Sequence, residues 1–346
     1  MGEHSVVYGY PAVAVPLKTL KMRAWASSTG RSGRNTLRAL GYYGPMLQAP
    51  AQFGGLMRAI QVAKDFAGCC ECGFDIITRS DFPAGRGLGS SAAASGAVIR
   101  AVLDACGIKA GAAQLAALTN EAETVTHGHP SGLDTVTTSG QHPVLFTHGD
   151  MRRVSVNTPA YLVIADSGVA GSTKEAVDGV RGQYEHDRLR VAPILKDLGA
   201  LAQQSAEDLK QGGLDSLGLR MDAAHRLLSE LHVSHPIVDA LVRAARSRGA
   251  LGAKLTGGGL GGCIIALAPD VLSAQRIRHA LLAAGAPSAW VHPLNQLDVE
   301  VANDASVEFD RIPERYDCAG PLPSAGACFV AGTDADADAI DAAFRG

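Results

Sequence analysis

Several classes of protein are excluded by what this sequence lacks. No run of apolar residues reaches the length of about 20 that spans a bilayer. Residues 1–6 contain no basic stretch followed by an apolar one, so we do not expect a signal peptide. Basic residues are not in excess, because the sequence has 31 Lys and Arg residues and 34 Asp and Glu residues. This balance argues against binding to nucleic acid or to a membrane surface.

The cysteines lack the pattern of a disulfide framework. They number seven, which is odd, and their spacing is irregular. This usage indicates a reducing, cytoplasmic location. Cys69, Cys70 and Cys72 lie close together, but no second Cys or His pair follows at the spacing of a zinc site. We therefore interpret the three as small residues that enter a strand, rather than as metal ligands.

A chain of 346 residues that is 47% hydrophobic suits two domains or one large one. Strand and helix patterns are mixed without strict alternation, which predicts an α+β fold. A polar break near 147–159 divides the chain into predicted domains over 1–150 and 155–296. We predict strands at 73–80, 141–147, 160–166 and 263–267, and helical patterns at 54–67, 90–106, 110–125 and 175–231.

The last segment, 297–346, has a different composition. From Asp298 onward it holds eleven acidic residues against three basic ones, and Ala and Asp alternate over 334–339. Such low complexity predicts an acidic tail that is solvated or loosely packed. A partner-binding segment is the less favoured alternative.

The glycine-rich loop at 83–93 is the first segment that indicates a ligand-binding site. Gly85, Gly87 and Gly89 lie between a predicted strand and a helix that starts at Ser90. Glycine lets the backbone approach a ligand closely, and a helix start offers unpaired N–H groups to an anion. The loop therefore predicts a phosphate site, in which a serine caps the helix or binds Mg²⁺ through its hydroxyl. An ordinary glycine turn is the alternative.

Two common phosphate motifs do not fit this loop. A Walker A loop needs a lysine after its last glycine, and none follows Gly89. The dinucleotide fingerprint needs a third glycine where Ser90 stands.

A second glycine run, 254–262, precedes a predicted buried strand. Five of the six residues from Gly257 to Gly262 are glycine, and each adds an entropic cost to folding. Close approach of the backbone to a ligand is our interpretation, and a tight packing corner is the alternative.

Two carboxylates belong to the segment Glu123…His127-Gly-His-Pro-Ser-Gly-Leu-Asp134, one at each end. Glu123 ends a predicted helix, and Asp134 follows a Pro-Ser-Gly turn. They suit one magnesium ligand and one catalytic group, although a solvated helix residue and a turn cap explain them equally well. His127 and His129 lie in a polar loop, where surface histidines are common.

With the opening Gly-Glu-His-Ser-Val-Val-Tyr-Gly at 2–9, these segments resemble the GHMP kinase family, named for galactokinase, homoserine kinase, mevalonate kinase and phosphomevalonate kinase. The resemblance spans about residues 2–295. It implies two α+β domains in the GHMP-kinase fold, with the active site in the cleft between them. It also implies ATP as co-substrate and Mg²⁺ as cofactor.

The resemblance assigns roles position by position. The stretch wrapping the ATP phosphates is Gly85, Arg86, Gly87, Leu88, Gly89, Ser90 and Ser91. Ser91 and Glu123 match the two magnesium ligands, and Asp134 matches the base that accepts the substrate hydroxyl proton. The positions assigned to the substrate are Glu3, His4, Thr173 and Gly258, with the role of Glu3 the least specified.

Within the family, the runs at 2–9 and 127–134 are most similar to those of members that phosphorylate (R)-mevalonate to 5-phosphomevalonate in isoprenoid precursor synthesis. We expect this activity. Phosphomevalonate, a sugar or homoserine is the alternative substrate. The family places a catalytic lysine on a first strand before the residue equivalent to Gly2, so a catalytically impaired nucleotide-binding paralogue is a further alternative. A homodimer is compatible with the sequence.

Overall fold

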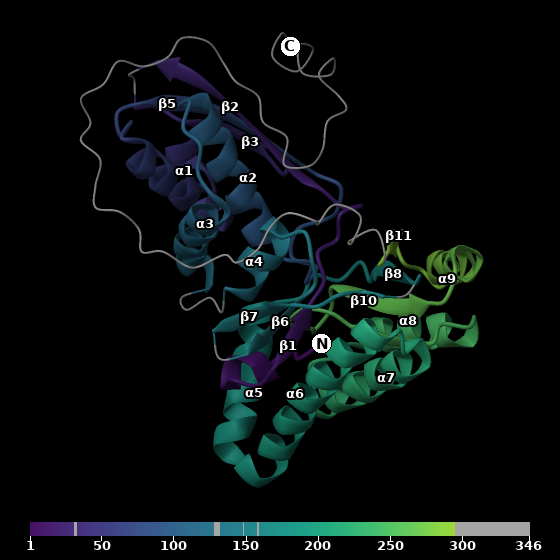
Figure 1. Cartoon of the computed structure of the whole chain (residues 1–346). Coiled ribbons are helices and arrows are strands. Elements are labelled where there is room, and N and C mark those ends of the chain that lie inside the picture. The colour runs from purple at the N-terminus through teal and green to yellow at the C-terminus, as the bar shows by residue number, and fades with distance from the viewer. Residues whose placement is uncertain (31–32, 128–131, 148, 158, 295–346) are drawn as a thin grey trace. The chain divides into compact units, whose positions relative to one another are not determined.

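The computed structural model of this chain describes residues 1–30, 33–127, 132–147, 149–157 and 159–294 (Figure 1). The chain divides into two compact units, and both are discontinuous in sequence. Unit 1 comprises 1–19, 83–90 and the described part of 129–306. Unit 2 comprises 20–82 and the described part of 91–128. The contiguous domains over 1–150 and 155–296 stay a prediction.

The described part of unit 2 is built on a four-stranded sheet and α-helices. The strand order is β2 (Met22–Gly30), β5 (Gly73–Ser80), β3 (Thr36–Ala39) and β4 (Tyr42–Pro45). Strand β5 pairs antiparallel with β2 and parallel with β3. The helices are α1 (Gly54–Ala67), α2 (Ser90–Ala105) and α3 (Ala112–His127). The first residue of α2, Ser90, belongs to unit 1. One buried cluster joins both kinds of element, and Phe74, Ile60 and Ile99 are among its least exposed members.

Unit 1 holds two sheets. The three-stranded one has the order β1 (Ala12–Ala14), β6 (Val144–Thr147) and β7 (Asp150–Arg153). The four-stranded one has the order β11 (Ala289–Pro293), β8 (Tyr161–Asp166), β10 (Cys263–Ala268) and β9 (Gly252–Leu255). The helices of this unit are α4 (Leu133–Ser139), α5 (Thr173–His186), α6 (Arg188–Gln211), α7 (Leu214–Glu230), α8 (Pro236–Ser247) and α9 (Val271–Ala283).

The four-stranded sheet of unit 1 is buried on both faces. Along β8, Val163 and Ala165 belong to one buried cluster, whereas Leu162 and Ile164 belong to another. Successive side chains of a strand point to opposite faces, so each face meets its own core. Helices α7, α8 and α9 pack against this sheet, as Figure 1 shows. The rigid sheet carries the second glycine run between β9 and β10.

The predicted strands at 73–80, 160–166 and 263–267 and the helices at 54–67, 90–106 and 110–125 are confirmed, with small shifts at their ends. The helical region 175–231 is interrupted twice. Asp187 accepts a hydrogen bond from the backbone N–H of Arg190 and so caps α6, and Gly212 ends the same helix with φ 79°. The hairpin β3–β4 and the helix α4 were not expected, and β7 forms inside the predicted boundary region.

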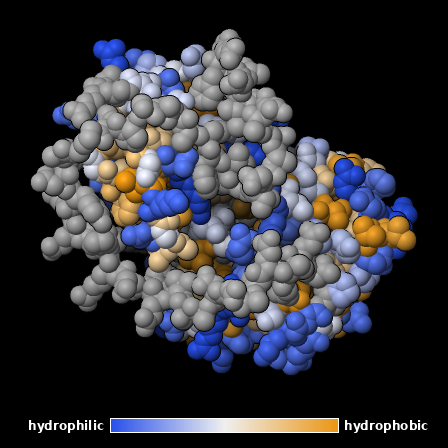
Figure 2. Space-filling view, turned by 45° about the horizontal axis from the view of Figure 1, so that its top comes forward, coloured by the Kyte–Doolittle hydropathy of each residue, from blue (hydrophilic) through white to orange (hydrophobic). Residues whose placement is uncertain are grey.

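The surface that the structure describes mixes polar and apolar residues. On the face that Figure 2 shows, hydrophobic residues form separate patches among hydrophilic ones. No helix in the described residues is both long and apolar enough to cross a membrane. The predicted acidic tail at 297–346 lies outside the described residues.

Candidate active site

The first glycine loop joins β5 to α2 and has an irregular backbone. Gly85, Gly87 and Gly89 have φ angles of 69°, 72° and 66°, in the left-handed region. Glycine adopts this region without the steric cost that a Cβ brings. The N–H of Gly85 donates a hydrogen bond to Ser90 Oγ at 3.3 Å, across the start of α2. The helix start expected at Ser90 is confirmed.

Gly87 and Gly85 differ in what surrounds them. A Cβ added at Gly87 would lie 2.5 Å from the carbonyl oxygen of Thr256, and one added at Gly257 would lie 2.4 Å from Gly87 Cα. The two glycine runs therefore contact each other backbone to backbone. A Cβ added at Gly85 would meet no described atom within 4 Å. Gly85 therefore borders open space.

The second glycine run is explained by packing inside unit 1. A Cβ added at Gly259 would lie 2.1 Å from the carbonyl oxygen of Val233, and one at Gly261 would lie 2.8 Å from that of Val169. A Cβ at Gly258 would lie 2.8 Å from Thr173 Cα. The close approach that these glycines permit is to the protein's own backbone. Packing, the alternative in the sequence analysis, accounts for them.

Two side chains of the first loop contact other residues of unit 1. Arg86 Nε lies 3.1 Å from Asp166 Oδ1, and Nη2 donates a hydrogen bond to the carbonyl of Gly168 at 3.4 Å. Only 4% of the Asp166 side chain is exposed. Leu88 packs against a buried cluster. The sequence did not single out Asp166, although its place at the end of a buried strand was a signal. The assignment of Arg86 and Leu88 to ATP stays a prediction.

Ser91 and Glu123 come together in unit 2 from two helices. Ser91 Oγ donates to Glu123 Oε1 at 2.8 Å, and Ser95 Oγ donates to the same oxygen at 3.0 Å. Glu123 is buried, and a buried carboxylate requires such partners. Its neighbour Ser95 was missed by the sequence analysis.

The Ser91–Glu123 pair offers oxygen atoms, which Mg²⁺ prefers. Mg²⁺ in phosphoryl-transfer sites is held by one or two carboxylates together with substrate phosphates and water. Within the described ranges, no group of three or more His, Cys, Asp and Glu residues is arranged to hold a metal ion. The pair therefore fits a partial ligand set that a nucleotide would complete.

Asp134 lies beside the first glycine loop in unit 1. It occupies the first turn of α4, after Gly132 with φ 79°, and its side chain is exposed. A Cβ added at Gly89 would lie 3.7 Å from Asp134 Cγ. The structure thus brings the predicted base next to a predicted phosphate-binding residue.

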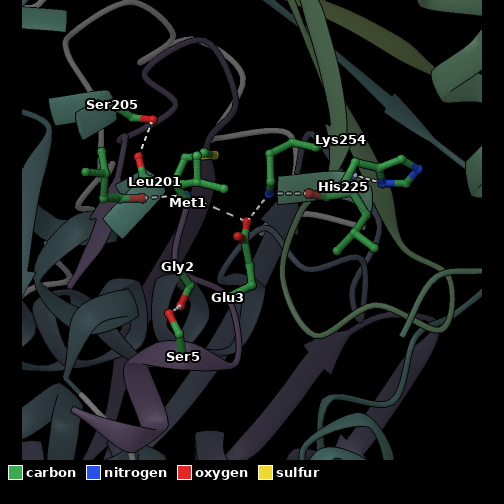
Figure 3. A network of polar contacts seen from close by, with 10 residues as sticks. Met1, Gly2, Glu3, Ser5, Leu201, Ser205, His225 and Lys254 are labelled. Carbon is green, nitrogen blue, oxygen red and sulfur yellow. Dashed lines mark hydrogen bonds and ion pairs between the residues drawn. The ribbon is translucent and has the colours of Figure 1, made fainter. Parts of the chain in front are cut away.

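The opening segment brings three predicted substrate residues together. His4 Nε2 lies 2.8 Å from the carbonyl oxygen of Gly258, which packs against Thr173 at the start of α5. Burial, the main cause, lowers the pKa of His4. The neutral ring donates from Nε2 to this carbonyl and keeps Nδ1 as an acceptor. Glu3 instead contacts Lys254, a residue that the sequence analysis did not single out (Figure 3).

The remaining candidates lie elsewhere. His127 ends α3, and His129 falls outside the described residues. The cysteines at 69–72 form the turn that enters β5, as expected. Cys69 Sγ lies 3.1 Å from Cys106 Sγ.

Comparison with known proteins decides the family. Residues 56–141 match the model of the GHMP kinases N terminal domain, and 205–287 match the model of the GHMP kinases C terminal domain. The mevalonate kinase of Thermococcus onnurineus is 33% identical over 292 residues, which cover 78% of this chain and 86% of that protein. The chain belongs to the GHMP kinase family. The α+β GHMP-kinase fold implied by the sequence motifs is confirmed.

Other comparisons place this GHMP kinase with the mevalonate kinases. That of Pyrococcus horikoshii is 34% identical over 289 residues, covering 78% of this chain and 85% of the relative. The crystal structure of L. major mevalonate kinase in complex with R-mevalonate has a TM-score of 0.72 at 24% identity. It covers 85% of this chain and 92% of that one, and it shows the shared fold.

Proposed function

We propose that this GHMP kinase transfers the γ-phosphoryl group of ATP to the C5 hydroxyl of (R)-mevalonate, giving 5-phosphomevalonate and ADP. The relation to mevalonate kinases over 86% of the length of the Thermococcus onnurineus protein carries the choice of substrate. The contacts among His4, Gly258 and Thr173 support a substrate site in unit 1.

The nucleotide phosphates are assigned to the first glycine loop and the start of α2. The open side of Gly85 gives them room, and backbone N–H groups at the helix start attract their negative charge. Ser91 and Glu123 would hold Mg²⁺, which supplies positive charge to the phosphates during transfer. Phosphoryl transfer depends chiefly on such positioning and charge stabilisation.

Asp134 is assigned as the group that accepts the proton of the C5 hydroxyl. Asp134 is an exposed residue, and it lies beside Gly89 of the phosphate loop. The mevalonate carboxylate needs hydrogen-bond donors, and the Thr173 hydroxyl is one candidate. The His4 imidazole is the other; because its Nε2 donates to the carbonyl of Gly258, it would donate to the substrate from Nδ1 in the protonated form.

The proposal includes a cytoplasmic location and a homodimer as the assembly to test. Cys69, Cys106 and Cys263 are thiols, as a reducing compartment favours.

Replacement of Asp134 by Asn tests the proposed base. Because general base catalysis contributes about 10²- to 10⁴-fold, we expect turnover to fall by about that factor while ATP binding is kept. The measurement is mevalonate-dependent ADP release, with nucleotide affinity determined in parallel. Asp215→Asn, at an exposed position of α7, is the matched control. Near-normal turnover by Asp134→Asn would contradict the assignment.

The substrate is tested on the unchanged chain. ADP release is compared for (R)-mevalonate, phosphomevalonate, galactose and homoserine at equal concentrations. We expect mevalonate to give the highest kcat/KM. Turnover with another of these compounds but not with mevalonate would overturn the proposed function.

A further inference from the structure

Lys254 is a charged residue in the interior of unit 1. It lies on β9 and is 0% exposed. Its Nζ donates to Glu3 Oε1 and to the backbone carbonyl of Leu255 (Figure 3). A buried ammonium is tolerated only when it is paired and hydrogen-bonded. These contacts and the complete burial keep Lys254 from touching a substrate directly.

Glu3 is itself largely buried, and its pairing with Lys254 keeps it ionised. Burial raises the pKa of Glu3, but the charge of Lys254 and its hydrogen bond to Glu3 outweigh burial and lower the pKa to about 2. Glu3 is therefore ionised across the physiological range. The ion pair joins two segments 251 positions apart in the chain.

The next residue, His4, has a backbone conformation that needs support. Its φ of 63° is unusual for a residue with a Cβ and stores strain. Such strain persists only where neighbouring contacts fix the chain. Two contacts do so here: Glu3 binds Lys254, and His4 Nε2 donates to the carbonyl of Gly258 at 2.8 Å. Two adjacent residues thus attach to two points, 254 and 258, of one glycine-rich segment.

We propose that Lys254 is a positioning residue: through its buried ion pair with Glu3 it holds residues 2–5 against the second glycine run and thereby fixes the His4 imidazole beside Gly258 and Thr173. This assigns Glu3 to the support of the site rather than to contact with mevalonate. The link to mevalonate rests on the proposed function, whereas the effect on the His4 ring does not.

The first readout is the His4 ring itself. Hydrogen–deuterium exchange at the imidazole C2 position, followed by mass spectrometry, reports how protected and how basic a histidine is. We expect the His4 exchange rate in Lys254→Met to rise severalfold, because the ring loses its fixed contact with Gly258. Lys196→Met, at an exposed position of α6, is the matched control and should leave the rate unchanged. An unchanged His4 rate in folded Lys254→Met would overturn the proposal, whether or not mevalonate is the substrate.

The second readout separates positioning from stability. The double variant Glu3→Gln/Lys254→Met removes both charges of the pair and leaves the Met1 amine its hydrogen bond to the carbonyl of Val13, so we expect it to fold even where Lys254→Met alone does not. A misplaced group in a site costs up to about 100-fold in rate. We therefore expect KM for mevalonate to rise about tenfold or more in the double variant, with ATP affinity within about twofold of the unchanged chain. Normal KM and kcat for mevalonate in the double variant would overturn the positioning role.

Failure of the proposed function gives a different result. In that case the unchanged chain itself releases no ADP with mevalonate, while the His4 exchange rates still distinguish Lys254→Met from Lys196→Met. Rescue provides the last check. Lys254→Arg keeps the charge, and we expect a His4 exchange rate closer to that of the unchanged chain than to that of Lys254→Met.

Discussion

At the scale of single residues, the ion pairs among the described residues range from buried to exposed. Arg86–Asp166 and Lys254–Glu3 are largely buried, with side-chain exposures of 15% and 4% in the first and 0% and 11% in the second. Arg181–Asp178 on α5 is exposed by 58% and 55%. Breaking a buried pair leaves a charge without water or partner, whereas an exposed charge is solvated after its partner is lost. The buried pairs lie at the two predicted binding loops.

Asp166→Asn tests the first buried pair. The amide oxygen can still accept the N–H of Gly168, which now bonds to Asp166 Oδ1 at 2.9 Å, so chiefly the charge is removed. We expect the free energy of unfolding to fall by about 3 kcal/mol, because the Arg86 guanidinium loses its counter-ion. Urea unfolding measures this change. Asp178→Asn is the control and should cost less than about 1 kcal/mol. Equal losses in the two variants would show that the Arg86–Asp166 pair contributes no more than a surface pair.

At the scale of elements, the two glycine runs have different partners. The run after β9 is packed against backbone at Gly257, Gly259 and Gly261, so each glycine there makes room for protein. The loop before α2 mixes a packed position, Gly87, with an open one, Gly85. A glycine-rich sequence therefore indicates that another group lies close to the backbone. Only the neighbouring atoms in the structure show whether that group is protein.

A pair of alanine substitutions separates these effects. Gly85 and Gly87 have similar φ angles, 69° and 72°, so alanine at either position carries the same backbone strain, about 1 kcal/mol. At Gly87 the new Cβ would also overlap the carbonyl oxygen of Thr256 at 2.5 Å. We expect Gly87→Ala to lower the thermal midpoint more than Gly85→Ala does. We expect Gly85→Ala to weaken nucleotide binding with only a small change in stability. Identical melting of the two variants would contradict the packing role of Gly87.

At the scale of the whole molecule, buried histidines make stability depend on pH. His4, His225 and His292 are largely buried, and burial is the main cause that lowers the pKa of each. The effect is largest for His292 on β11, whose pKa falls from 6.5 to about 4. Its Nδ1 lies 3.0 Å from Thr19 Oγ1. The folded chain therefore binds a proton at His292 less readily than the unfolded chain does.

The sign of the pH effect follows from this difference. Between pH 6.5 and about 4 the unfolded state binds more protons at His292, so the free energy of unfolding falls as the pH is lowered through this window. His292→Asn removes the titrating ring and keeps an acceptor for Thr19. We expect the free energy of unfolding of this variant to fall less over this window than that of the unchanged chain. The difference in this loss is on the order of 3 kcal/mol at pH 4. Urea unfolding at several pH values measures it, with the exposed His279→Asn as control. Parallel curves for His292→Asn and the unchanged chain would contradict the prediction.

Much of the fold follows from patterns that neighbouring residues carry. The apolar runs of β8 and β10, the glycines before α2 and the helix-forming stretch of α2 were each predicted from a short window of sequence. Elements with weak local signals were missed. The strands β3 and β4 have four residues each, and α4 is short and rich in Thr, which favours helices poorly.

The sequence by itself determined the order of the motifs, the helix start after the first glycine loop and the family to which they belong. Only the tertiary structure decided which distant residues meet. Ser91 and Glu123 are 32 positions apart, and His4 and Gly258 are 254 apart. Local propensity limits φ and ψ but says nothing about such pairs, because their contact depends on how whole elements pack. Our proposal reassigns Glu3 for that reason, since its partner Lys254 lies 251 positions away in the chain.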